Sequence, residues 1–254
     1  MPHTPFRLDD RVALVTGSAT GLGQAIAIGL AQAGADVVVS DLPGQSTEET
    51  AQAAAAHGAR VLHLDLDVRD PEQIAAAMQT VKAEFGRLDI LVNNAGINRP
   101  TAGLDVTRDI WDDHFDVNVK GGFFVAQAAA PMMIEQGHGR IIFISSQSGL
   151  IGIPGQPVYC ATKGAIINLV RTLGVEWARH GITVNSIAPT FVETNLTRTR
   201  LQQPEFLAFV LGKIPAGRLA LPEDVAAAAV YLASDGAGMV NATTLSVDGG
   251  WTAW

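Results

Sequence analysis

Short apolar runs rich in β-branched residues alternate along this chain with longer, alanine-rich stretches. The short runs predict strands at Val12–Thr16, Val37–Ser40, Arg60–Leu64, Ile90–Val92, Arg140–Ser145, Thr183–Ile187 and Leu245–Val247. The longer stretches predict helices near 22–33, 46–57, 71–85, 107–136, 158–179 and 222–233. Because strands separated by helices are typical of βαβ units, we expect an α/β fold with a parallel sheet and helices on both faces.

Helix-start and helix-stop residues agree with these limits. Asp70-Pro71 offers an N-cap followed by a first-turn proline, and Pro222 opens another helix in the same way. Gly34, Gly58 and Gly181 stand where helices should end. No linker, repeat or low-complexity block divides the 254 residues. We therefore expect a single domain over 1–254.

Composition and charge narrow the possible partners. The net charge of -8 and the pI near 5.1 argue against nucleic acid or an anionic membrane surface as the main partner. One cysteine excludes an internal disulfide framework, and no Cys/His cluster has metal-ligand spacing, so we expect no metal. The N-terminus lacks a signal-peptide layout and no apolar run approaches membrane-spanning length, which favours a soluble, cytoplasmic protein.

A glycine-rich turn follows the first predicted strand and leads into an alanine- and isoleucine-rich helix. Glycines at such a junction permit a tight turn and bring the backbone close to a pyrophosphate, which then faces the positive end of the helix. The alternative is that the turn has only a structural role. The position of the turn between a strand and a helix favours a cofactor site instead. The candidate cofactor-binding residues of this turn are Gly17, Ser18, Thr20, Gly21, Leu22 and Gly23.

Asp41 closes the second predicted strand. A carboxylate there can accept hydrogen bonds from ribose hydroxyls and repels a 2′-phosphate, although it could also serve as a turn or capping residue. Neither Ser18 nor Leu42 supplies the cation that a 2′-phosphate requires. The sequence therefore predicts NAD rather than NADP.

Tyr159 and Lys163 lie four residues apart in a predicted helix, which places their side chains on one face. An ammonium roughly 4 Å from a phenol supplies about 4 kcal/mol at an effective dielectric constant near 20. This is about three pKa units, enough to bring a tyrosine from about 10 into the range of a general acid/base. A half-buried tyrosine beside a lysine stem is the ordinary alternative.

Taken together, the glycine turn, Asn93-Asn94-Ala95-Gly96 and the Tyr159/Lys163 pair resemble the short-chain dehydrogenase/reductase family, over about residues 9–254. The resemblance implies a Rossmann-like doubly wound sheet and hydride transfer to or from a nicotinamide. It places the catalytic serine at Ser146, with Ser145 as the nearest alternative. It also assigns Asn118 to a helix distortion that holds a water near Lys163.

The same resemblance implies further cofactor contacts, at Asp67, Val68, Asn94, Val192 and Thr194, besides Tyr159 and Lys163 themselves. One departure from the family pattern stands next to them. The family shows Pro-Gly after the sixth strand, whereas this chain has Pro189-Thr190. Because a β-branched residue tolerates positive φ poorly, either the backbone stays extended here or the nicotinamide end is arranged differently.

The substrate side offers polar and cationic residues. We expect residues 195–217 to form a loop and helix that cover the substrate, with Arg198, Arg200 and Lys213 among them. Arg99 follows the Asn-Asn-Ala-Gly turn, and Gln147 stands beside Ser146. The candidate substrate residues are Ser146, Gln147, Tyr159 and Arg99. Solvated surface arginines are the alternative; the resemblance favours polyols and sugar acids.

Two helical stretches, 121–134 and 165–178, carry few charges. Helices that are apolar nearly all round need burial beyond one sheet face, which favours a homo-oligomer, and the resemblance implies a tetramer. The aromatic tail with Trp251 and Trp254 is expected to dock at a subunit interface or to close a neighbouring active site.

Two other functions stay open. A 3-oxoacyl-thioester reductase fits the same motifs, although Asp41 disfavours the NADPH that such anabolic enzymes use. A non-catalytic nucleotide-binding scaffold would need a broken Ser-Tyr-Lys set, and here Ser146, Tyr159 and Lys163 are all present.

Overall fold

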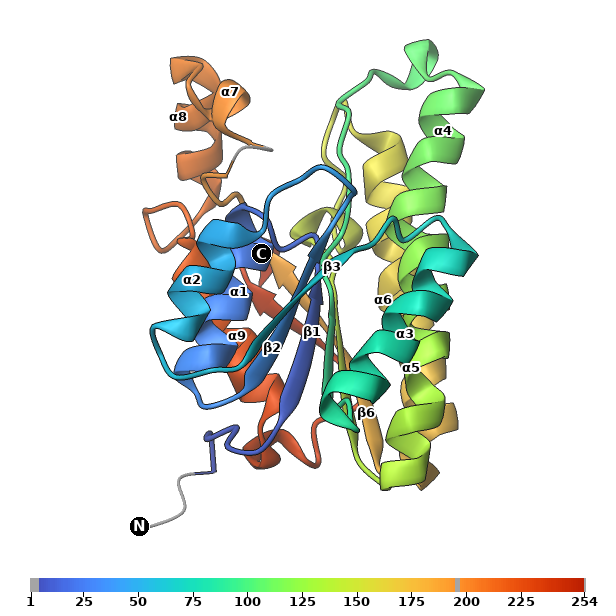
Figure 1. Cartoon of the computed structure of the whole chain (residues 1–254). Coiled ribbons are helices and arrows are strands. Elements are labelled where there is room, and N and C mark those ends of the chain that lie inside the picture. The colour runs from blue at the N-terminus through green and yellow to red at the C-terminus, as the bar shows by residue number, and fades with distance from the viewer. Residues whose placement is uncertain (1–4, 195–196, 254) are drawn as a thin grey trace.

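A single parallel sheet forms the centre of the molecule in a computed structural model that describes residues 5–194 and 197–253. Its strand order is β3-β2-β1-β4-β5-β6-β7 (Figure 1). The strands are β1 (Val12–Thr16), β2 (Asp36–Asp41), β3 (Val61–Asp65), β4 (Ile90–Asn93), β5 (Gly139–Ile144), β6 (Ile182–Pro189) and β7 (Thr244–Val247). The expected doubly wound α/β fold is confirmed.

Helices cover both faces of the sheet (Figure 1). One face carries α1 (Gly21–Gln32), α2 (Glu48–Ala55) and α9 (Pro222–Ala233). The other carries α3 (Pro71–Phe85), α4 (Arg108–Phe115), α5 (Gly122–Gln136) and α6 (Pro157–Trp177). Two short helices, α7 (Arg198–Leu201) and α8 (Pro204–Lys213), stand above the carboxyl ends of the strands.

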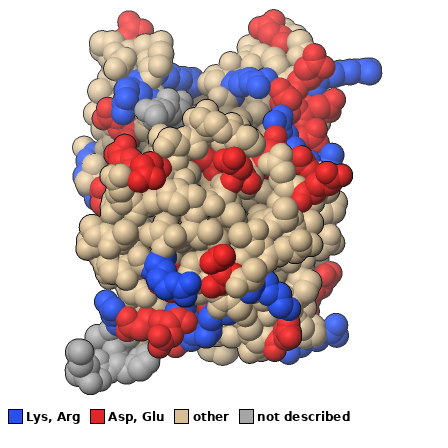
Figure 2. All heavy atoms as spheres, viewed as in Figure 1, with Lys and Arg blue, Asp and Glu red and all other residues tan. Residues whose placement is uncertain are grey.

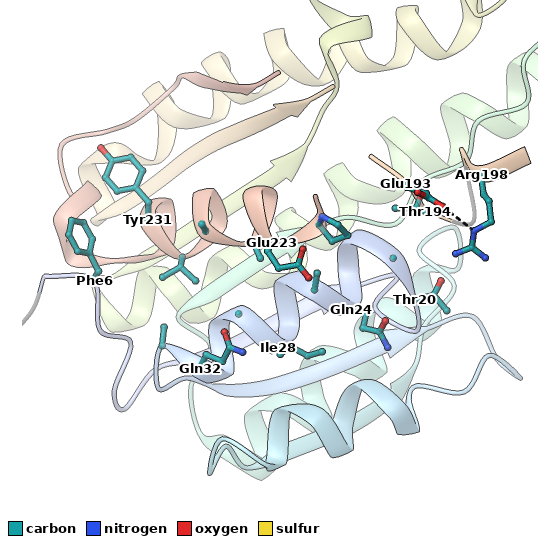
Figure 3. Close-up of a pocket in the computed structure, with 18 residues that line it drawn as sticks. Phe6, Thr20, Gln24, Ile28, Gln32, Glu193, Thr194, Arg198, Glu223 and Tyr231 are labelled. Atoms are coloured by element: carbon teal, nitrogen blue, oxygen red, sulfur yellow. Dashed lines mark ion pairs between the residues drawn. The ribbon is translucent and has the colours of Figure 1, made fainter. Parts of the chain in front are cut away.

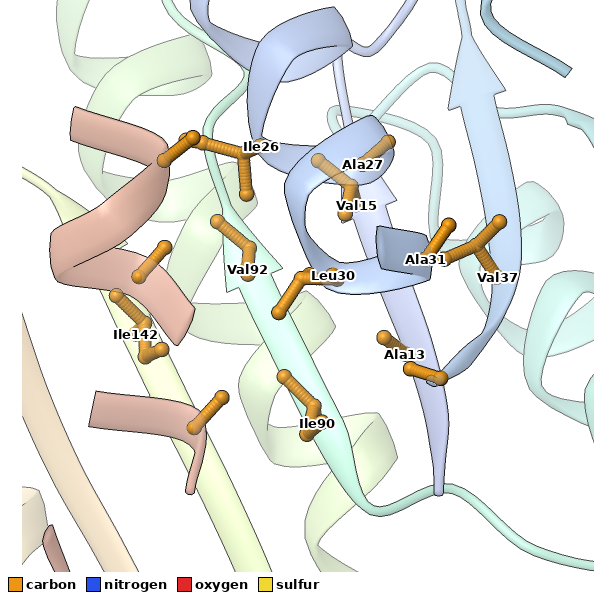
Figure 4. Packing of buried hydrophobic residues seen from close by; sticks show 14 of the residues in the cluster. Ala13, Val15, Ile26, Ala27, Leu30, Ala31, Val37, Ile90, Val92 and Ile142 are labelled. Atoms are coloured by element: carbon orange, nitrogen blue, oxygen red, sulfur yellow. The ribbon is translucent and has the colours of Figure 1, made fainter. Parts of the chain in front are cut away.

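The core lies in two apolar layers, one on each side of the sheet. Along β1, Ala13 and Val15 pack against Leu30 and its neighbours in α1, whereas Val12 and Leu14 face the opposite layer (Figure 4). Successive side chains of a strand point to opposite faces, so both must be apolar when helices cover both. This burial explains the uninterrupted apolar strands in the sequence.

The strand order reverses between β1 and β4, which are parallel neighbours although β2 and β3 lie between them in the sequence. The loops that leave these two strands therefore diverge and open a crevice at the carboxyl edge of the sheet. In open α/β sheets, ligands bind at such a point.

The predicted helix over 107–136 is not continuous. A π-helical turn, η2 (Asp116–Gly121), separates α4 from α5. The substrate-covering segment contains α7 and α8 as expected, while its first residues, Asn195 and Leu196, lie outside the described residues. None of the described helices is both long and apolar enough to cross a membrane.

The interface predicted for the aromatic tail is wrong for Trp251. Its indole is 6% exposed and packs within its own chain, 5.7 Å from the ring of Phe191 and 6.3 Å from that of Phe209. The apolar ring is thus buried beneath α8 without a second subunit. Trp254 lies outside the described residues.

Candidate active site

A cleft of about 510 Å³ opens at the crevice between β1 and β4. Its lining comes from the glycine turn, the ends of β2, β4 and β5, the start of α6 and the segment after β6. In Figure 2 the molecule is hollowed at the top, between the part that carries α7 and α8 and the part that carries α4.

The glycine turn needs glycine for two reasons. Gly17 has a φ of +64°, in the left-handed region that favours glycine. A Cβ on Gly23 would lie 2.2 Å from the Gly17 carbonyl oxygen and 2.5 Å from the Asn94 amide nitrogen. Asn94 in turn donates to the carbonyls of Thr16 (2.9 Å) and Gly17 (2.8 Å), which fixes the turn from β4. Sequence reasoning missed Thr16, whose hydroxyl accepts from the backbone of Asn94.

The N-terminus of α1 faces this cleft through Thr20, Gly21 and Leu22. The first turn of α1 contains no acidic residue, and the Thr20 side chain makes no capping bond. The N–H groups and the helix dipole are thus free to meet a phosphate. Ser18 differs from its neighbours, because it is fully buried and its hydroxyl accepts from Ser40 N at 2.9 Å. Its side chain secures the turn to β2 and does not line the cleft.

Asp41 lines the cleft at the end of β2. Its carboxylate oxygens accept from Ala19 N at 2.9 Å and from Leu42 N at 2.8 Å, which holds the side chain in one orientation. Each oxygen keeps a further lone pair. A negative charge is therefore fixed beside the glycine turn, where a ribose hydroxyl could donate to it.

Asp67 and Val68 lie on the same side of the cleft. The Arg69 side chain donates to the Asp67 carboxylate at 2.6 Å and lowers the pKa of that group. Arg69 also lines the cleft, and the sequence analysis did not single it out. The ion pair it forms leaves Asp67 charged but already partnered.

Tyr159 and Lys163 share one face of α6 and both line the cleft. Lys163 is 4% exposed, donates to the Ile144 carbonyl at 2.7 Å, and lies 5.5 Å from the centre of the Tyr159 ring. Burial lowers the pKa of Lys163 to about 8 and raises the pKa of Tyr159 to about 12. The expected fall in the Tyr159 pKa is therefore wrong for the protein by itself, because loss of hydration disfavours both charged forms.

The two candidate serines have different partners. Ser145 Oγ donates to the Lys163 carbonyl at 2.9 Å, which ties β5 to α6 and uses its proton. Ser146 Oγ accepts from Ser148 N at 3.1 Å and keeps its own O–H to donate. The Ser146 hydroxyl also lowers the pKa of Tyr159, opposing burial. This geometry favours Ser146 as the donor to a reacting oxygen.

Asn118 lies in the π-helical turn, as the expected helix distortion requires. Its Oδ1 accepts from Ile97 N at 2.7 Å, and its Nδ2 donates to the Ile97 carbonyl and to the hydroxyl of Thr162. The side chain thus connects the loop after β4 to α6, close to Lys163. A π-helical turn frees backbone carbonyls that an α-helix would use.

Comparison with known proteins agrees with this geometry. The model of a family described as Enoyl-(Acyl carrier protein) reductase matches residues 17–252. The 2-dehydro-3-deoxy-D-gluconate 5-dehydrogenase of Dickeya dadantii (strain 3937) is 43% identical over 249 residues, 98% of each chain. The D-threitol dehydrogenase of Mycolicibacterium smegmatis is 41% identical, over 97% of this chain and 95% of that one. A crystal structure of a gluconate 5-dehydrogenase from Burkholderia cenocepacia J2315, in complex with NADP and tartrate, has a TM-score of 0.94 and 40% identity over 98% of each chain.

The chain belongs to the short-chain dehydrogenase/reductase family. It is an oxidoreductase that acts on CH–OH groups with a nicotinamide dinucleotide. The dinucleotide, when bound, supplies the carbon that gives or takes the hydride. The residues present fit it, since the glycine turn admits a close pyrophosphate and the α1 N-terminus faces it.

The positions of the dehydrogenase's own residues indicate what each could do. At neutral pH the Tyr159 phenol holds its proton, because its pKa is raised to about 12, and it can give that proton to a carbonyl oxygen during reduction. In the oxidative direction the same oxygen can take the proton of the substrate hydroxyl only as the phenolate, so alkaline pH favours this step. Ser146 keeps an O–H that could donate to a reacting oxygen, and Lys163 brings a cation to the cleft below its pKa of about 8.

The departure at Thr190 causes no strain in this dehydrogenase. Among the described non-glycine residues only Asp10 and Ala242 have positive φ, so Thr190 keeps an ordinary backbone conformation. Its Oγ1 is buried at the cleft and has no hydrogen-bond partner among the described residues. Val192 and Thr194 also line the cleft, as expected.

The predicted substrate residues divide into two groups. Arg99, Ser146 and Tyr159 line the cleft, and Arg99 forms an ion pair with Asp113 at 2.6 Å. Gln147 is 1% exposed and does not line the cleft, and neither end of its amide has a partner within the described residues. Its side chain is packed beside Ser146 without facing the open space.

A second hollow of about 940 Å³ lies between α1 and α9, on their side away from the sheet (Figure 3). Small and apolar residues such as Ile28 form its floor, and Glu193 and Arg198, 4.0 Å apart, close one end. It shares Thr20, Gly21 and Thr194 with the cleft but contains none of the catalytic candidates.

Proposed function

We propose that this dehydrogenase oxidises secondary alcohols of sugar acids or polyols, or reduces the corresponding ketones, in a single catalytic domain over 1–254. The observation that carries the proposal is the arrangement of Ser146, Tyr159 and Lys163 around one cleft. The sugar-acid and polyol names of the relatives support the substrate class. In this proposal Asn118 positions the loop and helix around Lys163, while residues 195–217 cover the substrate.

The preferred cofactor in this proposal is NAD. Asp41 supports it, because its carboxylate is held by two backbone N–H groups beside the place where a 2′-phosphate would lie. Leu42 next to it is uncharged and exposed, and Arg69 is engaged by Asp67. A similar structure is described with NADP, which makes cofactor choice the first property to measure.

A 3-oxoacyl-thioester reductase is the second candidate, because a 3-oxoacyl-[acyl-carrier-protein] reductase of Thermotoga maritima is 37% identical to this chain over 245 residues. The Asp41 carboxylate disfavours this second candidate. Such reductions generally use NADPH, and the carboxylate would repel the 2′-phosphate of that cofactor.

One assay separates these functions. Absorbance at 340 nm is followed with NAD⁺ or NADP⁺ and D-gluconate, D-sorbitol or D-threitol, and with NADH or NADPH and a 3-oxoacyl thioester. We expect turnover with a sugar acid or polyol and NAD⁺. Reduction of the thioester alone would replace the proposal with the second candidate, and no turnover with any substrate would favour a non-catalytic scaffold.

We also propose that the enzyme is a homotetramer and acts in the cytoplasm. The outer faces of α4, α5 and α6 expose large apolar side chains, among them Trp111 (45%), Phe124 (43%) and Val175 (74%). Contact with further copies of the chain would remove this apolar area from water. The cytoplasmic location stays a prediction from the sequence.

A further inference from the structure

Besides Arg69 and Lys163, four cationic side chains line the cleft or lie in the segment expected to cover the substrate: Arg99, Arg198, Arg200 and Lys213. Two of them have an acidic neighbour, since Arg99 pairs with Asp113 at 2.6 Å and Arg198 lies 4.0 Å from Glu193. Lys213 is exposed to solvent at the end of α8. Only Arg200 is part-buried and lacks an acidic partner within the described ranges.

Arg200 is held in place by an aromatic ring. Its guanidinium carbon lies 4.1 Å from the centre of the Phe206 ring. A guanidinium over an aromatic face keeps its N–H donors at its edge, where they can form paired hydrogen bonds to a carboxylate. One of these nitrogens, Nη1, is buried and has no partner among the residues described.

The surroundings of Arg200 connect it to the cleft. Its backbone N–H donates to the carbonyl of Thr197 at 3.1 Å, and Thr197 lines the cleft. Residues three apart lie on the same side of a helical turn, so Arg200 lies one turn from this lining, although it is not itself among the residues that line the cleft. Phe206 and Cys160 pack against the same apolar cluster, and Cys160 directly follows Tyr159.

The electrostatics of Arg200 favour an anion. Burial lowers the pKa of this guanidinium, so the protein around it does not compensate its charge. Buried charges in proteins are normally paired, and a part-buried cation without a partner is costly. A ligand that brings a negative charge to the guanidinium edge removes that cost.

We propose that Arg200 binds the carboxylate of the substrate, so that hydroxy acids of the sugar-acid type are preferred over neutral polyols. This inference rests on the proposed function and narrows it to one of its two substrate classes. Arg200 lies over Phe206, which packs against the same apolar cluster as Cys160, the residue after Tyr159. This placement favours the substrate over the cofactor, whose phosphates are expected at the glycine turn.

Two substitutions test the inference. Arg200→Met removes the charge and keeps much of the side-chain length, and Arg200→Lys keeps the charge without the paired donors. Specificity constants are measured with D-gluconate and with neutral D-sorbitol, and the Kd of NADH by fluorescence titration. Arg200→Met should lose about ten- to a hundredfold in kcat/KM with the acid, the usual range for a hydrogen bond to a charged group. Its kcat/KM with the polyol and its NADH Kd should change by less than about threefold.

Arg198→Met is the matched control, because Arg198 lies on the same helix, is exposed and already pairs with Glu193. It should leave both substrates unaffected. Tartrate, a carboxylate that need not react, gives a second measure: its inhibition constant should rise in Arg200→Met and rise less in Arg200→Lys. This comparison of Arg200→Lys with the native enzyme decides the question if Arg200→Met fails to fold.

Three results would overturn the role of Arg200. They are an equal loss with acid and polyol, no loss with either, or a loss explained by weaker NADH binding. A native enzyme that oxidises polyols and no sugar acid would also refute it, while leaving the broader proposed function intact. Failure with every alcohol and ketone would instead overturn the proposed function itself.

Discussion

Lys163→Met should make the folded enzyme more stable at neutral pH while removing its activity. The Lys163 ammonium is 4% exposed, and burial lowers its pKa from 10.5 to about 8. Each pKa unit corresponds to about 1.4 kcal/mol, so keeping this lysine charged costs the folded state about 3 kcal/mol below pH 8. Methionine removes that cost but leaves the Ile144 carbonyl without its donor, which costs about 1–3 kcal/mol. The net effect at pH 7 lies between neutral and about 2 kcal/mol of stabilisation.

The pH dependence distinguishes this effect from a general change in packing. Between the folded pKa of about 8 and the unfolded value of 10.5, the unfolded chain binds more protons at Lys163 than the folded one. The Lys163 contribution to stability therefore rises with pH across this window and falls as pH drops through it. Urea unfolding of both proteins at pH 7, 8.5 and 9.5 should show the advantage of Lys163→Met shrinking by about 1 kcal/mol per pH unit above pH 8.

Activity should change in the opposite sense, since a cation at the cleft is lost. We expect a large fall in kcat and weaker binding of NADH. A difference in stability between the two proteins that stays constant from pH 7 to 9.5 would refute the reasoning, because it would show that Lys163 does not titrate in this window.

Three further predictions follow from the structure. Asp41→Ala with Leu42→Arg should erode or reverse a native preference for NAD over NADP of at least about tenfold in kcat/KM, and equal native use of both cofactors would contradict the role of Asp41. Burial lowers the pKa of His138 from 6.5 to about 4, so the free energy of unfolding should fall by about 3 kcal/mol as the pH drops through this range. His138→Gln should reduce that fall, and an acid unfolding transition that is the same in the variant would contradict this prediction. Light scattering should give four times the chain mass of 26.6 kDa, whereas a monomer at micromolar concentration would leave the exposed Trp111 and Val175 unexplained.

The sequence was sufficient for the sheet, most helix limits and the residues around the cleft. Apolar runs and capping residues report burial and helix ends directly, and so the helix predicted at 222–233 matches α9. The π-helical turn at Asn118 could not be read from the pattern, because one additional residue in a single turn leaves the helical pattern before and after it in place. The resemblance to a known family, and not periodicity, indicated the distortion there.

What the sequence could not give were properties that depend on partners distant in the chain. Ser18 looked like its neighbours until the structure placed its hydroxyl against Ser40. The pKa of Lys163 depends on how completely the surrounding elements bury its side chain. The sequence spacing between Lys163 and Tyr159 carries no information on that burial. The sequence alone does not distinguish Arg200 from Arg198. In the structure Arg198 lies near Glu193, whereas Arg200 has no acidic partner among the described residues.

The most direct test of the mechanism is the turnover of Tyr159→Phe with a substrate that the native enzyme oxidises. This change removes the phenolic oxygen and keeps the ring that packs against Lys163. General acid/base assistance contributes about 10²–10⁴ in rate, so kcat should fall by at least about a hundredfold while the Kd of NADH stays nearly constant. A variant that kept more than about a tenth of native turnover would contradict the assignment of Tyr159 as the proton-transferring residue.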